Sequence, residues 1–175
     1  MYDFNPKIII FGDVGVGKRT LAFKFLGGFF LSDSKITIGV DFYTKRLLVD
    51  KFKVKLHVWI FGGEERFIFL LPTYVRGASG GLFMYDITNY SSIAHIDDWL
   101  TVIRKEIRHE DQFPIIALGN KADLSEHREV SAEDLMKIAK SRRLDGFIEC
   151  SVKSGENVEE AFQALSRLII NIARL

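Results

Sequence analysis

The stretch Ile8-Ile9-Ile10-Phe11-Gly12-Asp13-Val14-Gly15-Val16-Gly17-Lys18 decides the fold of this chain. Its first four residues form a continuous β-branched and aromatic run, which is typical of a strand buried on both faces. The remainder fits G-x-x-x-x-G-K, a phosphate-binding loop between a strand and a helix. Backbone N–H groups, a helix N-terminus and Lys18 would then face an anion. The alternative, a glycine-rich turn without a ligand, is disfavoured because the turn directly follows a buried strand.

Short apolar runs and helical patterns alternate along the rest of the 175 residues. We expect further strands within residues 42–49, 54–58, 82–87, 115–118 and 147–150. We expect helices over residues 18–27, 93–107, 131–139 and 158–172, with Ser131 as an N-cap. This alternation predicts an α/β fold in one domain, residues 1–175, with a mostly parallel six-stranded sheet and helices on both faces. Ligands of such sheets bind at the carboxyl ends of the strands.

A second motif, Asn120-Lys121-Ala122-Asp123, follows the expected strand at 115–118. An aspartate there can accept hydrogen bonds from both N1–H and the exocyclic amine of guanine, a donor pair that adenine lacks. The alternative is an ordinary Asn/Asp turn. The phosphate loop at the matching edge of the sheet favours a guanine site instead, and Ser151-Val152-Lys153 at the end of the next strand could close over the base.

The composition excludes several classes of protein. With 24 basic and 23 acidic residues, the charge of +1 gives no reason to expect nucleic-acid binding. One cysteine, Cys150, allows no internal disulfide and favours a reducing compartment, so we expect a cytoplasmic protein. No apolar run is long enough to span a bilayer, and there is no C-terminal cysteine to prenylate. Membrane association would require a tail that this chain does not contain.

These motifs resemble those of the small GTPases of the Ras superfamily, closest to the Rab branch, over almost the whole chain. The segments 55–59, 74–78 and 84–88 resemble segments that separate Rabs from other Ras relatives. The resemblance implies binding of GTP or GDP as a molecular switch in trafficking or signalling, with effectors and exchange or activating factors as partners. It assigns nucleotide contacts to Val14, Gly15, Val16, Gly17, Lys18, Arg19, Thr20, Phe30, Thr37, Asn120, Lys121, Asp123, Ser151, Val152 and Lys153. It assigns effector contacts to Ile38, Phe42, Trp59 and Tyr74, of which the three aromatics could equally be ordinary core packing.

The sequence departs from the family pattern where magnesium and water are handled. Arg19 replaces the Ser or Thr that ligates Mg²⁺, and Ile60 replaces the aspartate of its shell. Glu64 replaces the glutamine that positions water, whereas Gly63 is kept, with an N–H that could sense a γ phosphate. Thr37 then remains as the one family metal residue, so the sequence argues against normal Mg²⁺ binding.

Two consequences are expected from these changes. Arg19 could supply part of the missing positive charge to the phosphates, or it could point to solvent and leave phosphate binding weak. Hydrolysis is expected to be very slow or absent, because Glu64 brings negative charge and Val14 adds bulk beside the γ phosphate. The leading interpretation is therefore a Rab-like GTP-binding protein with weak hydrolysis. The alternatives are a pseudo-GTPase that acts as a nucleotide-independent interaction module and, disfavoured by Asp123, an ATP-using P-loop enzyme.

Overall fold

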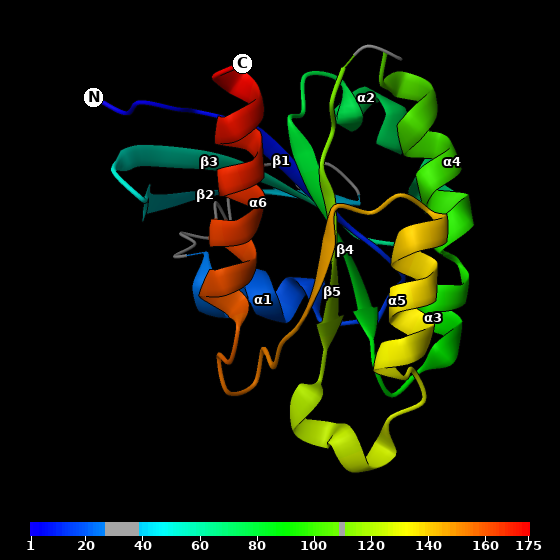
Figure 1. The fold of residues 1–175 in the computed structure, drawn as a ribbon. Helices are drawn as coiled ribbons and strands as arrows, with labels where there is room; N and C mark the ends of the chain where they lie inside the picture. The colour runs from blue at the N-terminus through cyan, green and yellow to red at the C-terminus, as the bar shows by residue number, and fades with distance from the viewer. Residues whose placement is uncertain (27–38, 109–110) are drawn as a thin grey trace.

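The computed structural model of the chain describes residues 1–26, 39–108 and 111–175. At its centre lies a six-stranded sheet with the strand order β2-β3-β1-β4-β5-β6 (Figure 1). β2 and β3 pair antiparallel, and the other neighbouring strands pair parallel. The predicted fold class is therefore confirmed. The strands are β1 (Lys7–Phe11), β2 (Val40–Val49), β3 (Phe52–Phe61), β4 (Gly80–Asp86), β5 (Ile115–Asn120) and β6 (Gly146–Glu149).

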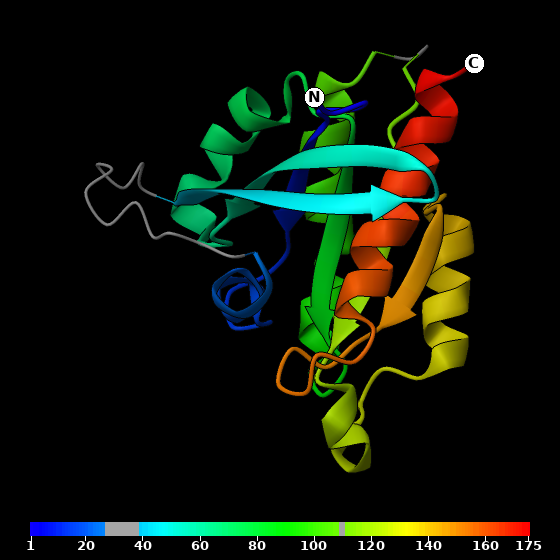
Figure 2. The same ribbon diagram turned by 90° about the vertical axis from the view of Figure 1, so that its left-hand side faces the viewer.

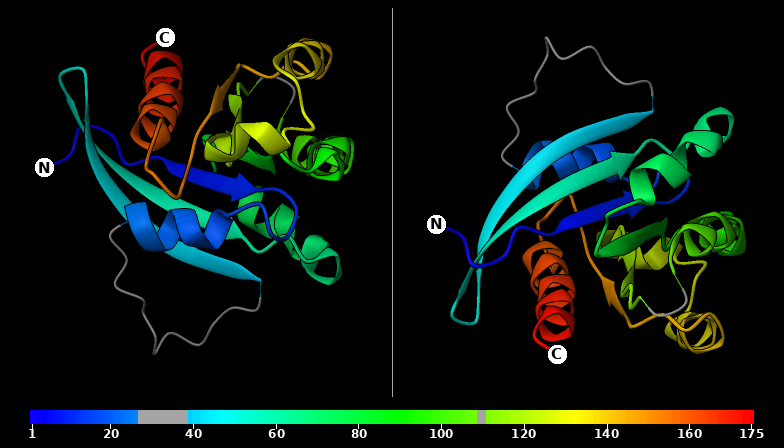
Figure 3. Two further views of the ribbon diagram at one scale, coloured as in Figure 1. Left: turned by 90° about the horizontal axis from the view of Figure 1, so that it is seen from below. Right: turned by 90° about the horizontal axis from the view of Figure 1, so that it is seen from above.

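Helices cover the two faces of the sheet (Figure 3). α1 (Lys18–Phe25) and α6 (Val158–Ala173) pack against one face of the sheet and form a hydrophobic cluster with it. A second cluster, on the other face, receives α2 (Leu71–Val75), α3 (Tyr90–Ala94), α4 (Ile96–Glu106) and α5 (Ala132–Ser141). Two 3-10 helices, η1 (Glu65–Leu70) and η2 (Ala122–His127), belong to connections at the sheet edge. Figure 2 shows β2 and β3 as one long hairpin, with η1 and α2 beside the end at which β3 finishes.

The first strand is buried on both faces, as its composition predicts. Ile8 and Ile10 pack into the cluster with α1 and α6, whereas Ile9 and Phe11 pack into the cluster on the opposite face. None of the four is more than 1% exposed. Because the parallel strands β1, β4, β5 and β6 share one direction, their carboxyl ends and the following loops meet at one edge of the sheet.

One expected element differs from the structure. The apolar spacing over residues 93–107 predicts a single helix, but α3 ends at Ala94 and α4 starts at Ile96. His95 between them has φ −80° and ψ 4°, which interrupts the helix. The spacing persists because Ile93 and Ile96 both bury in the same cluster. The expected cap at Ser131 is confirmed, since its side chain accepts a hydrogen bond from the Asp134 N–H at the start of α5.

In the part of the chain that the structure describes, no helix is long and apolar enough to cross a membrane.

Candidate functional site

The loop between β1 and α1 is shaped by glycines that no other residue could replace. Gly12 has φ 139°, and a Cβ there would lie 2.1 Å from the Met84 carbonyl oxygen. Gly17 has φ 110°, and a Cβ there would lie 2.3 Å from the Nδ2 of Asn120. Contacts this short are incompatible with a side chain, and positive φ is costly for other residues. The loop therefore lies directly against the ends of β4 and β5.

Lys18 is a buried cation at the start of α1. Its side chain reaches back so that Nζ donates hydrogen bonds to the carbonyl oxygens of Gly12 and Asp13, at 2.6 and 2.7 Å. No carboxylate of a described residue lies within ion-pair distance of it. Burial lowers its pKa from 10.5 to about 7, because desolvation penalises the charged form. An anion beside Nζ would restore the charge, which is what a phosphate does at a helix N-terminus.

A cavity of about 240 Å³ lies next to Lys18, and Arg19, Ile60 and Glu64 are among the residues that line it. Arg19 lines it and is exposed, whereas Ile60 is 1% exposed and offers no oxygen. Mg²⁺ needs several hard oxygen ligands in near-octahedral geometry. Among residues 1–26, 39–108 and 111–175, no group of three or more His, Cys, Asp or Glu side chains could hold a metal ion. Arg19 and Ile60 thus offer no hydroxyl or carboxylate oxygen to an ion in this cavity, whereas Thr20, Asp41 and Glu64 in its lining carry side-chain oxygens. The lining residues are Val14, Gly15, Gly17, Lys18, Arg19, Thr20, Asp41, Ile60, Gly62 and Glu64.

Asp41 is a lining residue that the sequence did not single out. It lies on β2 opposite Ile60 of β3 and thus enters the cavity from the hairpin. The sequence pattern of β2 could have indicated this position. Phe42 and Thr44 are exposed, so the alternating odd-numbered residues of this strand, including Asp41, lie on its inner face. Asp41 and Glu64 are the carboxylates in this lining, and Glu64 pairs with Arg66, Oε2 to Nε, at 2.8 Å.

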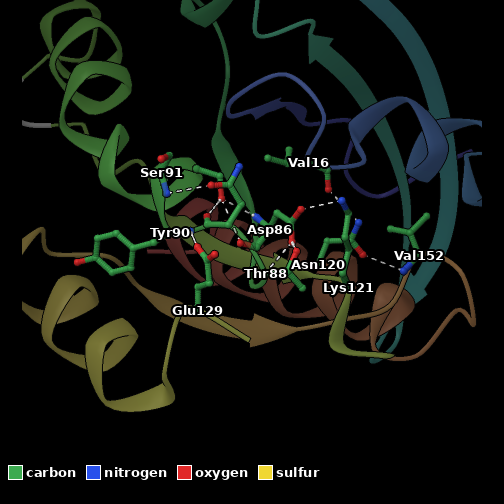
Figure 4. Close-up of polar contacts among 11 residues, drawn as sticks. Val16, Asp86, Thr88, Tyr90, Ser91, Asn120, Lys121, Glu129 and Val152 are labelled. Carbon is green, nitrogen blue, oxygen red and sulfur yellow. Dashed lines mark hydrogen bonds and ion pairs between the residues drawn. The ribbon is translucent and has the colours of Figure 1, made fainter. Parts of the chain in front are cut away.

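Asn120 links two of the loops that the sequence assigned to the site (Figure 4). It is 4% exposed at the end of β5. Its Nδ2 donates to the Val16 carbonyl oxygen at 2.9 Å, and its Oδ1 accepts from the Val152 N–H at 3.0 Å. One side chain therefore fixes the phosphate loop and the loop after β6 relative to each other.

Asp123 and Ser151 form the other pair across these loops. The buried Ser151 hydroxyl donates to Oδ1 of Asp123 at 2.8 Å and accepts from the Ser154 N–H at 3.1 Å. Asp123 is exposed, and its Oδ2 has no hydrogen bond to a described residue. The carboxylate is thus oriented on one side and open on the other. Lys153 is also exposed here, with its carbonyl oxygen accepting from Lys24 Nζ at 3.2 Å.

Lys121 is positioned by an acidic residue that the sequence did not assign. Asp86, at the end of β4, is 6% exposed, and its Oδ2 lies 2.7 Å from the Nζ of Lys121 (Figure 4). Its Oδ1 accepts hydrogen bonds from the N–H and hydroxyl of Thr88, at 2.8 and 2.6 Å. Burial alone would raise the Asp86 pKa, but the bonds from Lys121 and Thr88 hold it below its usual value. The sequence feature that could have indicated Asp86 is a carboxylate at the end of an otherwise apolar strand.

The phosphate loop is also tied to α4 through Asp13. Its Oδ2 lies 2.5 Å from Nδ1 of His95, and its Oδ1 accepts from Nε1 of Trp99 at 2.9 Å. The hydrogen bond and charge of Asp13 raise the pKa of His95 above 6.5. No local pattern could reveal this contact, because the partners are more than 80 residues apart.

Comparison with known proteins decides the family. The family model described as "Ras family" matches residues 7–171. The chain belongs to the Ras family. Its similar Ras-family relatives include "GTP-binding protein ypt3" of Schizosaccharomyces pombe, 41% identical over 98% of this chain and 78% of that protein. Human "Ras-related protein Rab-37" is 41% identical over 95% of this chain and 74% of the relative. Human "Ras-related protein Rab-26" is 42% identical over 95% of this chain, which spans 64% of that protein. The chain is thus a Rab-like member of the family.

The Ras-family hydrolysis positions lie against the phosphate loop. Gly63 has φ 86°, and a Cβ there would lie 2.5 Å from the Gly12 carbonyl oxygen and 2.9 Å from Lys18 Nζ. Its backbone therefore lies directly over the lysine. Val14 is 63% exposed and lines the cavity next to Lys18.

The structure also brings together the three aromatic residues to which the resemblance assigns effector contacts. The ring centroids of Phe42 and Trp59 are 4.5 Å apart at 84°, and those of Trp59 and Tyr74 are 5.3 Å apart. Phe42 remains 44% exposed, whereas Trp59 and Tyr74 are partly buried and pack against the hydrophobic cluster that receives α2 and α4. We call Phe42, Trp59 and Tyr74 the aromatic cluster. Three predicted residues, Phe30, Thr37 and Ile38, lie outside the described residues.

Proposed function

We propose that residues 1–175 form a single Rab-like domain that binds GTP or GDP and acts as a switch in trafficking or signalling. The observation that carries this proposal is the buried Lys18 ammonium, whose described partners are two carbonyl oxygens. Burial without a counter-charge is costly, and a phosphate would supply that charge. The name of the S. pombe relative, a GTP-binding protein, agrees with this.

Selection of guanine rests on Asp123. Ser151 orients one carboxylate oxygen, and the second is open to accept from the base. A bidentate pairing of a carboxylate with two N–H donors discriminates strongly against a base that lacks them. Asn120 and Lys121 hold the same loop in place through Val16, Val152 and Asp86.

Nucleotide binding is proposed to depend little on magnesium. Arg19 and Ile60 stand where the family places a hydroxyl and a carboxylate, and a guanidinium beside phosphates can replace part of the charge of a metal ion. Hydrolysis is proposed to be very slow. Glu64 adds a negative charge in the same cavity, and its carboxylate pairs with Arg66.

The partners are proposed to be effector proteins that contact the aromatic cluster, and exchange or activating factors that act on the loops around Lys18. Its Rab-type relatives support these classes of partner. Attachment to a membrane would depend on a segment outside this sequence, and we propose a cytoplasmic or peripheral location.

The first test is to denature the purified protein and to chromatograph the nucleotide that it releases. The proposal predicts guanine nucleotide, mostly GTP. Mostly GDP would contradict the slow hydrolysis while leaving guanine binding in place. Release of adenine nucleotide would contradict the role of Asp123.

The second test measures release of a fluorescent guanine nucleotide with Mg²⁺ and with EDTA. We expect EDTA to change the rate little in the unaltered protein, and Arg19→Ser to release nucleotide faster in EDTA. Arg108→Ser is the matched control, since Arg108 is an exposed arginine away from the cavity. Unchanged affinity of Arg19→Ser without magnesium would refute the role of Arg19.

A second candidate function is a nucleotide-independent interaction module. The aromatic cluster favours it, because its three rings contact one another and Phe42 remains 44% exposed. Absence of released nucleotide, with partner binding lost on replacement of Phe42, would support this candidate over the first.

A further inference from the structure

The outer face of the β2–β3 hairpin carries a row of basic side chains. Cross-strand neighbours on this face are Phe42 and Trp59, then Thr44 and His57, Arg46 and Lys55, and Leu48 and Lys53. The intervening residues of β3 are its buried ones, Val54, Leu56 and Val58, and they pack into the cluster with α1 and α6. The remaining residues therefore point away from that core. We call Arg46, Leu48, Lys53 and Lys55 the basic face.

Positively charged side chains lie opposite each other on the two strands of this face. Arg46 of β2 lies directly across from Lys55 of β3. Side chains in such pairs are about 5 Å apart, and like charges directly opposite are destabilising. Within the described ranges, the side chains of Arg46, Lys53 and Lys55 form no ion pair and no hydrogen bond. The chain as a whole is nearly neutral, with 24 basic and 23 acidic residues, so the face is a local concentration of charge.

Two carboxylates, those of Asp3 and Asp50, lie at the edge of this face. Oδ2 of Asp3 accepts the backbone N–H of Lys53 at 2.7 Å. Asp50, at the hairpin turn, pairs with Arg167 of α6 at 3.2 Å. None of these carboxylates neutralises the Arg46–Lys55 pair. A partner that brings carboxylates would therefore relieve a repulsion that the free protein retains.

The basic face continues into the aromatic cluster. Lys7 of β1 lies across from His57, and its Nζ stands 3.6 Å from the centroid of the Trp59 ring. Leu48 is 61% exposed and Phe42 is 44% exposed, so apolar surface lies at both ends of the row of charges. Fixed aromatic rings beside exposed cations are typical of protein-binding surfaces, in which aromatic and arginine side chains dominate affinity.

We infer that this combined face docks an acidic segment of a partner protein. Its carboxylates would meet Arg46, Lys53 and Lys55, and its apolar side chains would contact Leu48 and the aromatic cluster. An anionic membrane would match the charges, but the rings pack edge-on against each other and are not free to insert into lipid. This inference deepens the partner side of the proposed function, because it adds the chemistry of the partner to the aromatic cluster.

The test selects peptides from a displayed library of random helical sequences on the immobilised protein, loaded with either a GTP analogue or GDP. We expect the enriched sequences to be acidic with apolar positions between the carboxylates. The same peptides should bind at least about tenfold more weakly to the triple variant Arg46→Glu, Lys53→Glu, Lys55→Glu, and their affinity should fall as salt rises. The milder variant, with Gln at the three positions, should show an intermediate loss.

A control variant makes the same change in net charge elsewhere on the surface. It carries Glu at three exposed lysines of α4 and α5, namely Lys105, Lys137 and Lys140. We expect it to bind the acidic peptides within about twofold of the unaltered protein. Circular dichroism and thermal melting of all variants identify any loss of folding, in which case the Gln variant supplies the comparison.

Three outcomes would overturn the inference. The first is that the enriched peptides show no acidic bias. The second is that acidic peptides bind the Glu variant as well as they bind the unaltered protein. The third is that the protein binds no acidic peptide and instead co-sediments with anionic, but not with neutral, phospholipid vesicles. Failure of the proposed function is distinguishable, because the released nucleotide is measured on the same preparation. If the preparation releases no nucleotide but still enriches acidic peptides, the nucleotide-dependent switch is refuted and the docking of an acidic segment on this face is supported.

Discussion

Replacing Asn120 by alanine should destabilise the protein more than the loss of such a small side chain suggests. The side chain is 4% exposed and satisfies two buried backbone groups, the carbonyl oxygen of Val16 and the N–H of Val152. A buried polar group that loses its partner costs about 1–3 kcal/mol. Two such groups, allowing for partial relaxation of the loops toward water, should lower the free energy of unfolding by about 2–4 kcal/mol.

The assay is urea unfolding of protein from which nucleotide has been removed, because a ligand bound to the native state would add to its stability. Gln163→Ala is the matched control. Its amide also donates to a backbone carbonyl, that of Leu48 at 2.9 Å, but at an exposed position, so we expect a loss below about 0.5 kcal/mol. If Asn120→Ala costs no more than Gln163→Ala, the two loops are not held together by this side chain.

Three further predictions follow from single contacts. Asp86→Ala should lower the free energy of unfolding by about 1–3 kcal/mol in urea unfolding, because Lys121 loses its partner; an unchanged midpoint would contradict this. Asp13 raises the pKa of His95, so the stabilisation from that contact should be complete below about pH 6.5 and lost as pH rises through the higher folded value. Between pH 8.5 and pH 5.5, the stability of the unaltered protein should change in favour of the lower pH relative to that of His95→Gln, in which the titration of Lys18 still acts. Tyr85→Phe should leave the melting temperature unchanged or raise stability by up to about 1 kcal/mol, since the buried hydroxyl has no partner among the described residues; clear destabilisation would mean that it has one.

The fold was predictable because its signals are local. A run such as Ile8 to Phe11 requires burial on both faces, and the alternation of Val54, Leu56 and Val58 with polar residues requires burial on one. The break at His95 was not predictable, because the apolar residues on either side keep helical spacing. Periodicity reports which face is buried, and two short helices on the same face preserve it.

The candidate site was predictable where backbone geometry dictates the residue. Gly12 and Gly17 are required by contacts under 2.5 Å, and such requirements leave a readable motif. The roles of Asp13, Asp86 and Asp41 were missed for the opposite reason. Asp13 and Asp86 depend on His95 and Lys121, partners that only the fold brings close, and Asp41 enters the cavity through its place opposite Ile60.

Ile60 and Arg19, the positions at which we propose that the magnesium site is altered, differ in their burial. Ile60 is 1% exposed and packs into the cluster with α1 and α6, so its burial contributes about 1.5–3 kcal/mol. An aspartate in the same environment would lose several kcal/mol to desolvation unless a cation or hydrogen bonds compensated it. The protein with Ile60 therefore needs no metal ion to stabilise this end of β3. Arg19, which is exposed, can change partners without disturbing the core. A buried Lys18 whose partners among the described residues are two carbonyl oxygens, next to an exposed Arg19, would suit the magnesium-independent phosphate binding that we propose.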